Sequence, residues 1–200
     1  MRLLLFSDLH AHRAATRLLL DRAASADVLI GAGDFGNMRR DVRVCIAILC
    51  ETDRPAVLVA GNGESTEELT EACRAWPQAH VLHGTGVTIQ GVPFFGIGGT
   101  VPVTPFGSWS YDFTEEQATA LLAPCPAGCV LVTHSPPQGT VDASSQGRHL
   151  GSTAVRDAIL RVGPRLVVCG HIHACGGQQG TMGTTPVVNA GPDGVDWTLS

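Results

Sequence analysis

Side chains that can bind metals or transfer protons follow directly after five apolar runs of the chain. These short sequences are Ser7-Asp8-Leu9-His10, Gly33-Asp34, Gly61-Asn62, Thr133-His134 and Gly170-His171-Ile172-His173. Three of the five place a glycine next to the polar residue, which lets the backbone turn sharply there. Ligand sites of open α/β sheets lie at the carboxyl ends of strands. We therefore expect these side chains to meet at one point.

The set contains two Asp, one Asn and four His, and no Cys. Imidazole, carboxylate and amide oxygen suit borderline divalent metals, and the lack of Cys argues against a structural zinc site. Seven ligands are too many for one open metal site. With one shared carboxylate they would serve two ions about 3.5–4 Å apart, an arrangement used for attack on phosphate.

Each short sequence is common when it occurs alone. An aspartate such as Asp8 after a strand is often a helix N-cap, and a single histidine such as His134 is often structural. His171 and His173 are a stronger pair, because residues two apart on an extended chain face the same way. The evidence for a metal site lies in the whole set, each member at the end of a strand.

Apolar runs and capping signals predict the elements that must position these side chains. Strands are expected over 2–8, 27–34, 55–61, 129–134, 165–171, 185–191 and 195–200, and helices over 12–25, 40–51, 66–76 and 153–162. In the first helix, Leu18, Leu19 and Ala23 are expected to share one face. Ser65-x-x-Glu68 predicts a capping box, and Thr114-x-x-Gln117 predicts the start of a further helix.

The middle of the chain has a different character. Residues 80–99 contain short apolar segments separated by glycine, which favours an antiparallel meander. Residues 100–113 are rich in Pro, Gly and aromatics and predict a surface insertion, and 135–151 predict a long polar loop. The order of elements predicts an α/β fold in which helices flank two packed, mixed β-sheets, formed by a single domain over residues 1–200.

Composition limits the classes of function. The net charge is −5 with a pI near 5.8, and all 13 basic residues are Arg, so no broad positive field favours nucleic acid. Seven Cys without a CxxC pair favour reduced thiols in the cytoplasm over a disulfide framework. The apolar run at residues 3–6 is too short for a membrane span or a signal sequence, so we expect no membrane contact.

The five short sequences resemble the pattern of the calcineurin-like metallophosphoesterase superfamily, which is D-x-H, G-D-x-x-[DN], G-N-[HC]-[DE], a single H and G-H-x-H. The chain reads Asp8-Leu9-His10, Gly33-Asp34-Phe35-Gly36-Asn37, Gly61-Asn62-Gly63-Glu64, His134 and Gly170-His171-Ile172-His173. The phrases THSPPQG (133–139), GRHLGS (147–152) and PRLVVCGHIH (164–173) resemble a small phosphodiesterase branch of that superfamily. The resemblance implies the four-layer αββα sandwich of the family.

The resemblance also implies a ligand set for each metal. The first metal would be bound by Asp8, His10, Asp34 and His173, and the second by Asp34, Asn62, His134 and His171, with Asp34 bridging. Two divalent ions are implied, with Mn²⁺ expected and Fe, Zn or Co as alternatives. A hydroxide between them would attack phosphorus. Arg148 and His149, in the 135–151 loop, are the candidates for substrate contact.

Gly63 departs from the family pattern, because many members carry His there, close to the leaving-group oxygen. Glycine cannot donate a proton, and loss of a general acid typically costs 10²–10⁴-fold for a poor leaving group. Either another group supplies the proton or the enzyme favours good leaving groups. Asn-Gly is also a strong turn signal, because both residues tolerate positive φ.

A phosphodiesterase for a small phosphoester is the preferred hypothesis. The alternatives are a phosphomonoesterase, a nuclease of the same fold and a non-catalytic metal-binding scaffold. The nuclease is retained as an alternative because of the local arginine cluster Arg39, Arg40 and Arg43. The sequence leaves a homo-oligomer open and does not identify the substrate.

Overall fold

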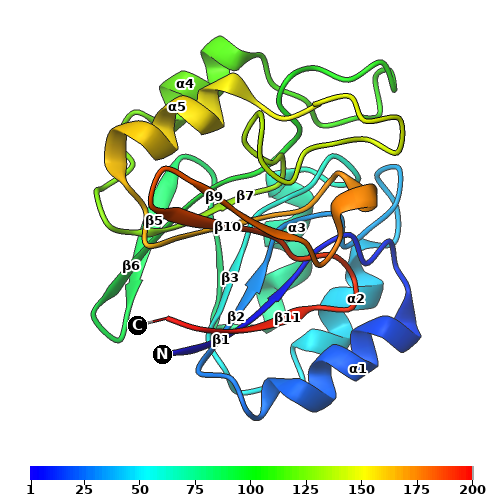
Figure 1. Ribbon diagram of the computed structural model, residues 1–200. Coiled ribbons are helices and arrows are strands. Elements are labelled where there is room, and N and C mark those ends of the chain that lie inside the picture. The colour runs from blue at the N-terminus through cyan, green and yellow to red at the C-terminus, as the bar shows by residue number, and fades with distance from the viewer. Residues whose placement is uncertain (200) are drawn as a thin grey trace.

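Two β-sheets packed face to face form the centre of the protein, and helices cover both outer faces (Figure 1). The computed structural model describes residues 1–199. The first sheet has the strand order β11-β1-β2-β3-β4, and the second has the order β5-β6-β7-β8-β10-β9. Each sheet contains both parallel and antiparallel pairs. The predicted four-layer arrangement of two mixed sheets between helices is confirmed.

The first sheet is built from β-α units that begin at the N-terminus. Its strands are β1 (Arg2–Phe6), β2 (Val28–Gly31), β3 (Ala56–Leu58), β4 (Ala79–Val81) and β11 (Val195–Thr198). Its helices are α1 (Arg13–Ala23), α2 (Val42–Leu49) and α3 (Thr66–Ala72), the last followed by the short 3₁₀ helix η1 (Cys73–Ala75). Strands β1 to β4 are parallel, and β11 pairs antiparallel with β1.

The second sheet contains the remaining strands. They are β5 (Thr85–Ile89), β6 (Val92–Ile97), β7 (Val130–Thr133), β8 (Leu166–Cys169), β9 (Gln179–Met182) and β10 (Thr185–Asn189). Helices α4 (Glu115–Leu122) and α5 (Thr153–Val162) cover its outer face, and the 3₁₀ helix η2 (His173–Cys175) follows β8. Strands β6, β7, β8 and β10 are parallel.

Alternation along each strand divides the core into layers. Leu3 and Leu5 of β1 point between the sheets, where they pack with residues of β7 and β8. Leu4 and Phe6 point the other way and pack beneath α1 and α2. Successive side chains therefore face opposite apolar layers, as expected for a strand buried on both faces. Packing on both faces fixes the position of each strand end relative to the adjacent strands.

Capping residues set where the helices begin. The Ser65–Glu68 and Thr114–Gln117 capping boxes both form, as predicted. In α1 the N-cap is His12, whose Nδ1 accepts the amide of Ala15 at 3.1 Å.

Two sequence-based expectations for individual elements are wrong, and one strand was not predicted. Residues 80–99 do not form one meander, because β4 joins the first sheet parallel to β3 and only β5 and β6 make an antiparallel pair. Leu18 does not share the buried face of α1, since it is 66% exposed while Leu19 is 1% exposed. The edge strand β9 was not predicted, because its sequence QGTM lacks an apolar run.

The strand expected over 195–200 ends at Thr198, and Ser200 lies outside the described residues. The two ends of the described chain lie side by side, since the terminal amine of Met1 donates to the carbonyl of Leu199 at 3.1 Å. Among residues 1–199, every helix is too short or too polar to cross a bilayer.

Candidate metal centre

The seven predicted ligands meet where the carboxyl ends of strands from both sheets converge. Their positions are Asp8 and His10 after β1, Asp34 after β2, Asn62 after β3, His134 after β7, and His171 and His173 after β8. β1, β2 and β3 are adjacent and parallel, and so are β7 and β8. The expected convergence at strand ends is therefore observed, with four ligands from one sheet and three from the other.

Glycine permits the close approach of the loops after β2 and β3. Gly33 has φ +92°, and a Cβ there would lie 2.6 Å from both the Cα of Gly61 and Nδ1 of His134. No other residue type could occupy this position without moving one of those groups. The glycine of Gly33-Asp34 thus has the role that the sequence suggested.

The first group of ligands is Asp8, His10 and His173, whose ligand atoms lie within 4.8 Å of one another. His173 Nε2 lies 3.6 Å from Asp8 Oδ1, and 3.1 Å from His10 Nε2. Burial raises the pKa of Asp8, but the hydrogen bond from His173, the charge of His134 and the hydroxyl of Ser7 outweigh it and lower the pKa to about 2. Asp8 is therefore a carboxylate at neutral pH, as a metal ligand must be.

The second group centres on His134, which is fully buried. Its Nε2 lies 3.6 Å from Asp34 Oδ1 and 3.3 Å from Asn62 Oδ1. Its Nδ1 donates to the carbonyl of Ala32 at 2.7 Å, so Nε2 is the ring nitrogen that faces the carboxylates. Burial lowers the pKa of His134, but the charges of Asp34 and Asp8 outweigh it and raise the pKa, so a metal bound at Nε2 would take the place of a proton there. Asp8, Asp34 and His134 also place their ligand atoms within 4.8 Å of one another.

His171 completes the second group, with its ring centroid 5.1 Å from that of His134. Burial, followed by the charge of His134, lowers the pKa of His171 to about 3. It is therefore a neutral imidazole, the form that can donate a lone pair to a cation. Its amide donates to both carboxylate oxygens of Asp8, at 3.1 and 3.2 Å, and so connects the two groups.

Asp34 lies between the two groups. Its Oδ2 is 3.7 Å from Nε2 of His10, and its Oδ1 is 3.6 Å from Nε2 of His134. The amide of Gly63 donates to Oδ1 at 2.7 Å and fixes the carboxylate in this orientation. One oxygen of Asp34 thus faces each group of ligands.

Four of the seven candidate ligands have left-handed backbone conformations. The φ angles are +57° at Asp8, +44° at His10, +57° at Asp34 and +64° at His171. Such φ values are uncommon outside glycine and accumulate at functional sites, where the surrounding structure must hold them.

Glu64 holds the loops in place and was not predicted to do so. It is buried, and its carboxylate accepts the amides of Asp34, Gly61 and Gly36 at 2.8–2.9 Å. Burial, followed by the charge of Asp34, raises the pKa of Glu64 to about 7. Glu64 therefore supports the candidate metal site from behind. The sequence signals for it were an acid in a short turn before the N-cap Ser65 and its match to the last position of the G-N-[HC]-[DE] pattern.

Five of the seven candidate ligands border a cleft of about 240 Å³. Its lining consists of His10, Asp34, Asn37, Met38, Asn62, Gly63, Phe106, Trp109, His171 and His173. Gly63 is not among the glycines with positive φ, so the left-handed turn that Asn-Gly suggested is not formed there. Gly63 instead borders the cleft directly, where a side chain would face the site.

The two residues predicted to contact substrate lie elsewhere on the 135–151 loop. His149 Nδ1 is 2.6 Å from Oδ1 of Asp142, a buried carboxylate that also accepts the amides of Gly139 and Gly151. Arg148 is exposed, and neither Arg148 nor His149 lines the cleft. In this structure His149 stabilises its own loop.

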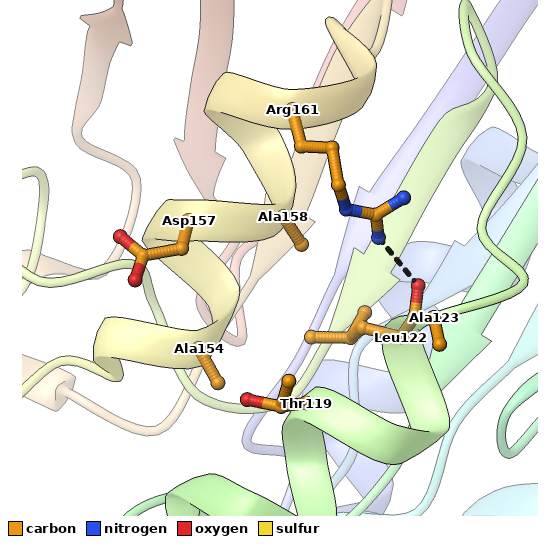
Figure 2. A pocket seen from close by; sticks show the side chains of 7 residues that line it. All are labelled: Thr119, Leu122, Ala123, Ala154, Asp157, Ala158 and Arg161. Atoms are coloured by element: carbon orange, nitrogen blue, oxygen red, sulfur yellow. Dashed lines mark hydrogen bonds between the residues drawn. The ribbon is translucent and has the colours of Figure 1, made fainter.

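A second hollow, of about 430 Å³, lies between α4 and α5 (Figure 2). It is lined mainly by small and apolar side chains, and its arginine, Arg161, donates to the carbonyl of Leu122 at 2.7 Å. None of the seven candidate ligands lines it. The chemistry is therefore concentrated at the strand ends.

The sequence of residues 1–175 matches the family described as calcineurin-like phosphoesterase. The chain belongs to this family. Comparison with curated proteins finds no match. Calcineurin-like phosphoesterases are metal-dependent phosphoric ester hydrolases, and the two groups of side chains above are where this member could bind metal.

Solved structures of the same fold agree with the family match. The protein TT1561 of Thermus thermophilus is 18% identical, with a TM-score of 0.77 over 100% of this chain and 99% of that one. An archaeal phosphodiesterase is 16% identical, with a TM-score of 0.57 over 96% and 84%. A dimetal phosphatase from Danio rerio is 12% identical, with a TM-score of 0.62 over 94% and 86%. At such identities these likenesses establish the fold.

Proposed function

We propose that the protein is a two-metal phosphodiesterase that hydrolyses small phosphodiesters. The observation that carries this proposal is the position of Asp34, with one carboxylate oxygen towards each of two groups of ligands. A single metal would leave one of these groups without a cation. The arrangement favours two ions that share one carboxylate.

The donor set fits borderline divalent metals. Asp8 is ionised, His171 is neutral, and Nδ1 of His134 donates to a carbonyl, which leaves Nε2 as the nitrogen that would bind a metal. Nδ1 of His10 is buried without a hydrogen-bond partner, so its Nε2 is the ring nitrogen directed at the site. We assign Asp8, His10, Asp34 and His173 to one metal, and Asp34, Asn62, His134 and His171 to the other. Mn²⁺ is the metal we would test first.

When bound, the two metals supply an activated water and positive charge that offsets the charge developing on phosphate. The residues of the chain provide the rest. Asp8 and Asp34 bring the negative charge that retains two cations, and Asn62 adds an oxygen without adding charge. Glu64 and the amide of Gly63 hold Asp34 in its orientation, so that the ligand spacing does not depend on the substrate.

The cleft favours a diester over a monoester. No Arg or Lys lines it among the described residues, and position 63 has no side chain. A monoester carries two negative charges and gains most from an additional cation, whereas a diester carries one. The absence of a general acid at Gly63 further favours esters whose leaving group needs no proton.

The other hypotheses predict different surfaces. A nuclease needs a free positive track for the backbone, but Arg39 pairs with Glu68 and Arg43 pairs with Glu71. A non-catalytic scaffold would tolerate loss of ligands, whereas all seven lie together here. We also propose the cytoplasm as the compartment, because all seven cysteines are free.

The test is metal reconstitution followed by a rate comparison. The protein is stripped with a chelator, reloaded with Mn²⁺, and assayed on bis(p-nitrophenyl) phosphate and on p-nitrophenyl phosphate, which share a leaving group. We expect two metals per chain and a higher kcat/KM on the diester. A higher value on the monoester would favour the phosphomonoesterase, and full metal occupancy without turnover of any activated diester would favour the scaffold.

Asp34→Asn is the decisive variant. It should retain fewer than two metals and lose more than about 100-fold in rate, since loss of even a supporting residue at a metal site costs 10–100-fold. Asp157→Asn is the matched control, because Asp157 is an exposed aspartate on α5 that lines the hollow far from the ligands. Equal metal content and rate in the two variants would contradict the assignment of Asp34 as the bridging ligand.

A further inference from the structure

We propose that Phe106, Trp109 and Met38 form a binding surface for a planar aromatic group of the substrate. We call these three residues the aromatic wall. They line the same cleft as the candidate metal ligands. The inference rests on the proposed function, because the metals would hold the phosphate of the same molecule.

The two rings of the aromatic wall are held parallel to each other. Phe106 and Trp109 stack with their centroids 5.7 Å apart and their planes 7° from parallel. Phe106 is nevertheless 49% exposed and Met38 is 53% exposed. Single exposed apolar residues are common, but large apolar side chains that gather at the edge of a ligand cleft are typical of a binding surface.

The loop that carries the rings is held firmly at its base. Thr104 donates its amide and its hydroxyl to Asp112, and the Ser110 hydroxyl donates to the same carboxylate. The amide of Tyr111 donates to the carbonyl of Asn62 at 3.2 Å. The segment that carries Phe106 and Trp109 is therefore attached directly to the backbone of a candidate metal ligand.

Met38, the third member of the aromatic wall, is held in the same way. Met38 has φ +47°, and the amide of its neighbour Arg39 donates to the carbonyl of Gly63 at 2.7 Å. The guanidinium of Arg39 makes two hydrogen bonds to Glu68, at 2.8 and 3.0 Å. Met38 is thus placed by the loop that also borders position 63, and its thioether can contact an aromatic edge.

The chemistry of the aromatic wall selects the class of ligand. It has two aromatic rings and a thioether, and no charge, so it attracts flat, apolar groups by stacking and dispersion. A methyl or glycerol group, which has no flat face, would gain little from it. The cleft of about 240 Å³ has room for a phosphate and one ring system. We therefore infer an ester that carries a nucleobase or an aryl ring as the non-leaving group.

The experiment uses three diesters with the same p-nitrophenyl leaving group, assayed with the Mn²⁺-loaded protein. The other ester group is methyl, phenyl or thymidine 5′-yl. The variants are Trp109→Leu and Phe106→Leu, which keep apolar volume but remove a ring. Val103→Ala is the matched control, because Val103 is an exposed apolar residue of the same loop that does not line the cleft.

We expect the wild-type KM to be lower for the phenyl or the thymidine ester than for the methyl ester. Each ring-removing variant should raise KM for the aromatic esters roughly tenfold, as expected for loss of a stacking partner. The methyl ester and the Val103→Ala variant should change less than about twofold. An effect on thymidine alone would identify a nucleotide ligand, and an effect on phenyl alone would identify an aryl ligand; both outcomes support the proposal.

Equal changes for the methyl and aromatic esters would overturn it. Calorimetry provides a second readout that does not depend on turnover. Phenylphosphonate should bind the Mn²⁺-loaded protein more tightly than methylphosphonate does. The Trp109→Leu variant should bind the two phosphonates equally. If no ester is hydrolysed but this difference is found, the proposed function fails and the aromatic wall stands. If esters are hydrolysed and no difference is found, the aromatic wall fails and the proposed function stands.

Discussion

Position 63 offers the most direct test of how this site handles the leaving group. Replacing Gly63 by His would place an imidazole beside Asp34, at the border of the cleft. If the protein lacks only a proton donor, Gly63→His should accelerate hydrolysis of esters with poor leaving groups. Aryl esters, which need little protonation, should change little.

The structure gives the size of the steric cost. A Cβ at Gly63 would lie 3.1 Å from the carbonyl oxygen of Gly36 and 3.2 Å from Oδ1 of Asp34. These contacts are tight, so the neighbours must move by a few tenths of an ångström, and overpacking of this kind costs about 1–3 kcal/mol of folding stability. Backbone strain adds nothing, because φ at Gly63 is not positive.

For poor leaving groups, the gain in kcat/KM from a proton donor should exceed the loss in rate that the displacement of Asp34 causes. A positioned general acid contributes 10²–10⁴-fold, and we expect about 100-fold for a newly introduced imidazole. Gly63→Ala isolates the steric part, because it adds the same Cβ without the acid. It should lower the rate for every ester by a similar factor by displacing Asp34.

The assay is kcat/KM across a series of methyl phosphodiesters whose leaving groups range from p-nitrophenol to an alkyl alcohol. The slope of log kcat/KM against the pKa of the leaving group should be shallower for Gly63→His than for the wild type or Gly63→Ala. Asn62→Ala provides the contrasting case, because loss of a metal ligand should lower all rates alike. An equal gain for all leaving groups in Gly63→His would refute proton donation and show that His binds phosphate.

Three further predictions concern a support of the site, a buried thiol and the two apolar layers around β8. Glu64→Gln should lower the free energy of unfolding, measured by urea titration, by about 1–3 kcal/mol. The glutamine side chain has one acceptor oxygen where the carboxylate uses two, so a buried backbone N–H loses its partner. Unchanged stability would show that Glu64 is dispensable. Burial raises the pKa of Cys73 to about 12, so little thiolate exists at pH 8. Alkylation of Cys73 should therefore be slow at pH 8 and become faster as the pH rises, and the less buried Cys50 should react first. Faster labelling of Cys73 than of Cys50 would contradict this order. Val167 and Val168 are adjacent, fully buried residues of β8, and replacing either by Ala should cost about 2 kcal/mol of stability. Only Val168→Ala should weaken Mn²⁺ binding, because only Val168 packs in the layer between the sheets. Equal Mn²⁺ affinities of the two variants would refute this distinction.

Local sequence patterns predicted most elements because those elements depend on local physics. The helix starts at Thr66 and Glu115 follow from capping boxes that four residues define. The strands that carry the ligands are short apolar runs followed by glycine or a hydroxyl residue. By contrast, β4 was assigned to the wrong sheet, because its partner β3 lies on the other side of α3 in the sequence and the residues of β4 do not encode that pairing.

The same distinction explains what was missed around the site. The convergence of the candidate ligands could be predicted, because each must follow a strand to reach the common point. Glu64 could not be identified as a support, because its three amide partners belong to loops distant in sequence or to its own turn. His149 was chosen for its residue type in a polar loop, and only the fold shows that Asp142 is its partner.

The origin of the ligands in both sheets has a structural consequence. Asp8, Asp34 and Asn62 follow strands of the first sheet, and His134 and His171 follow strands of the second, so no single layer fixes the spacing between them. That spacing depends on the apolar layer between the sheets, which forms one continuous cluster. Such interiors are close-packed and tolerate little displacement. The left-handed backbone at several candidate ligands is therefore held by packing on both sides, and the four-layer fold must form before these side chains lie close enough to bind a metal together.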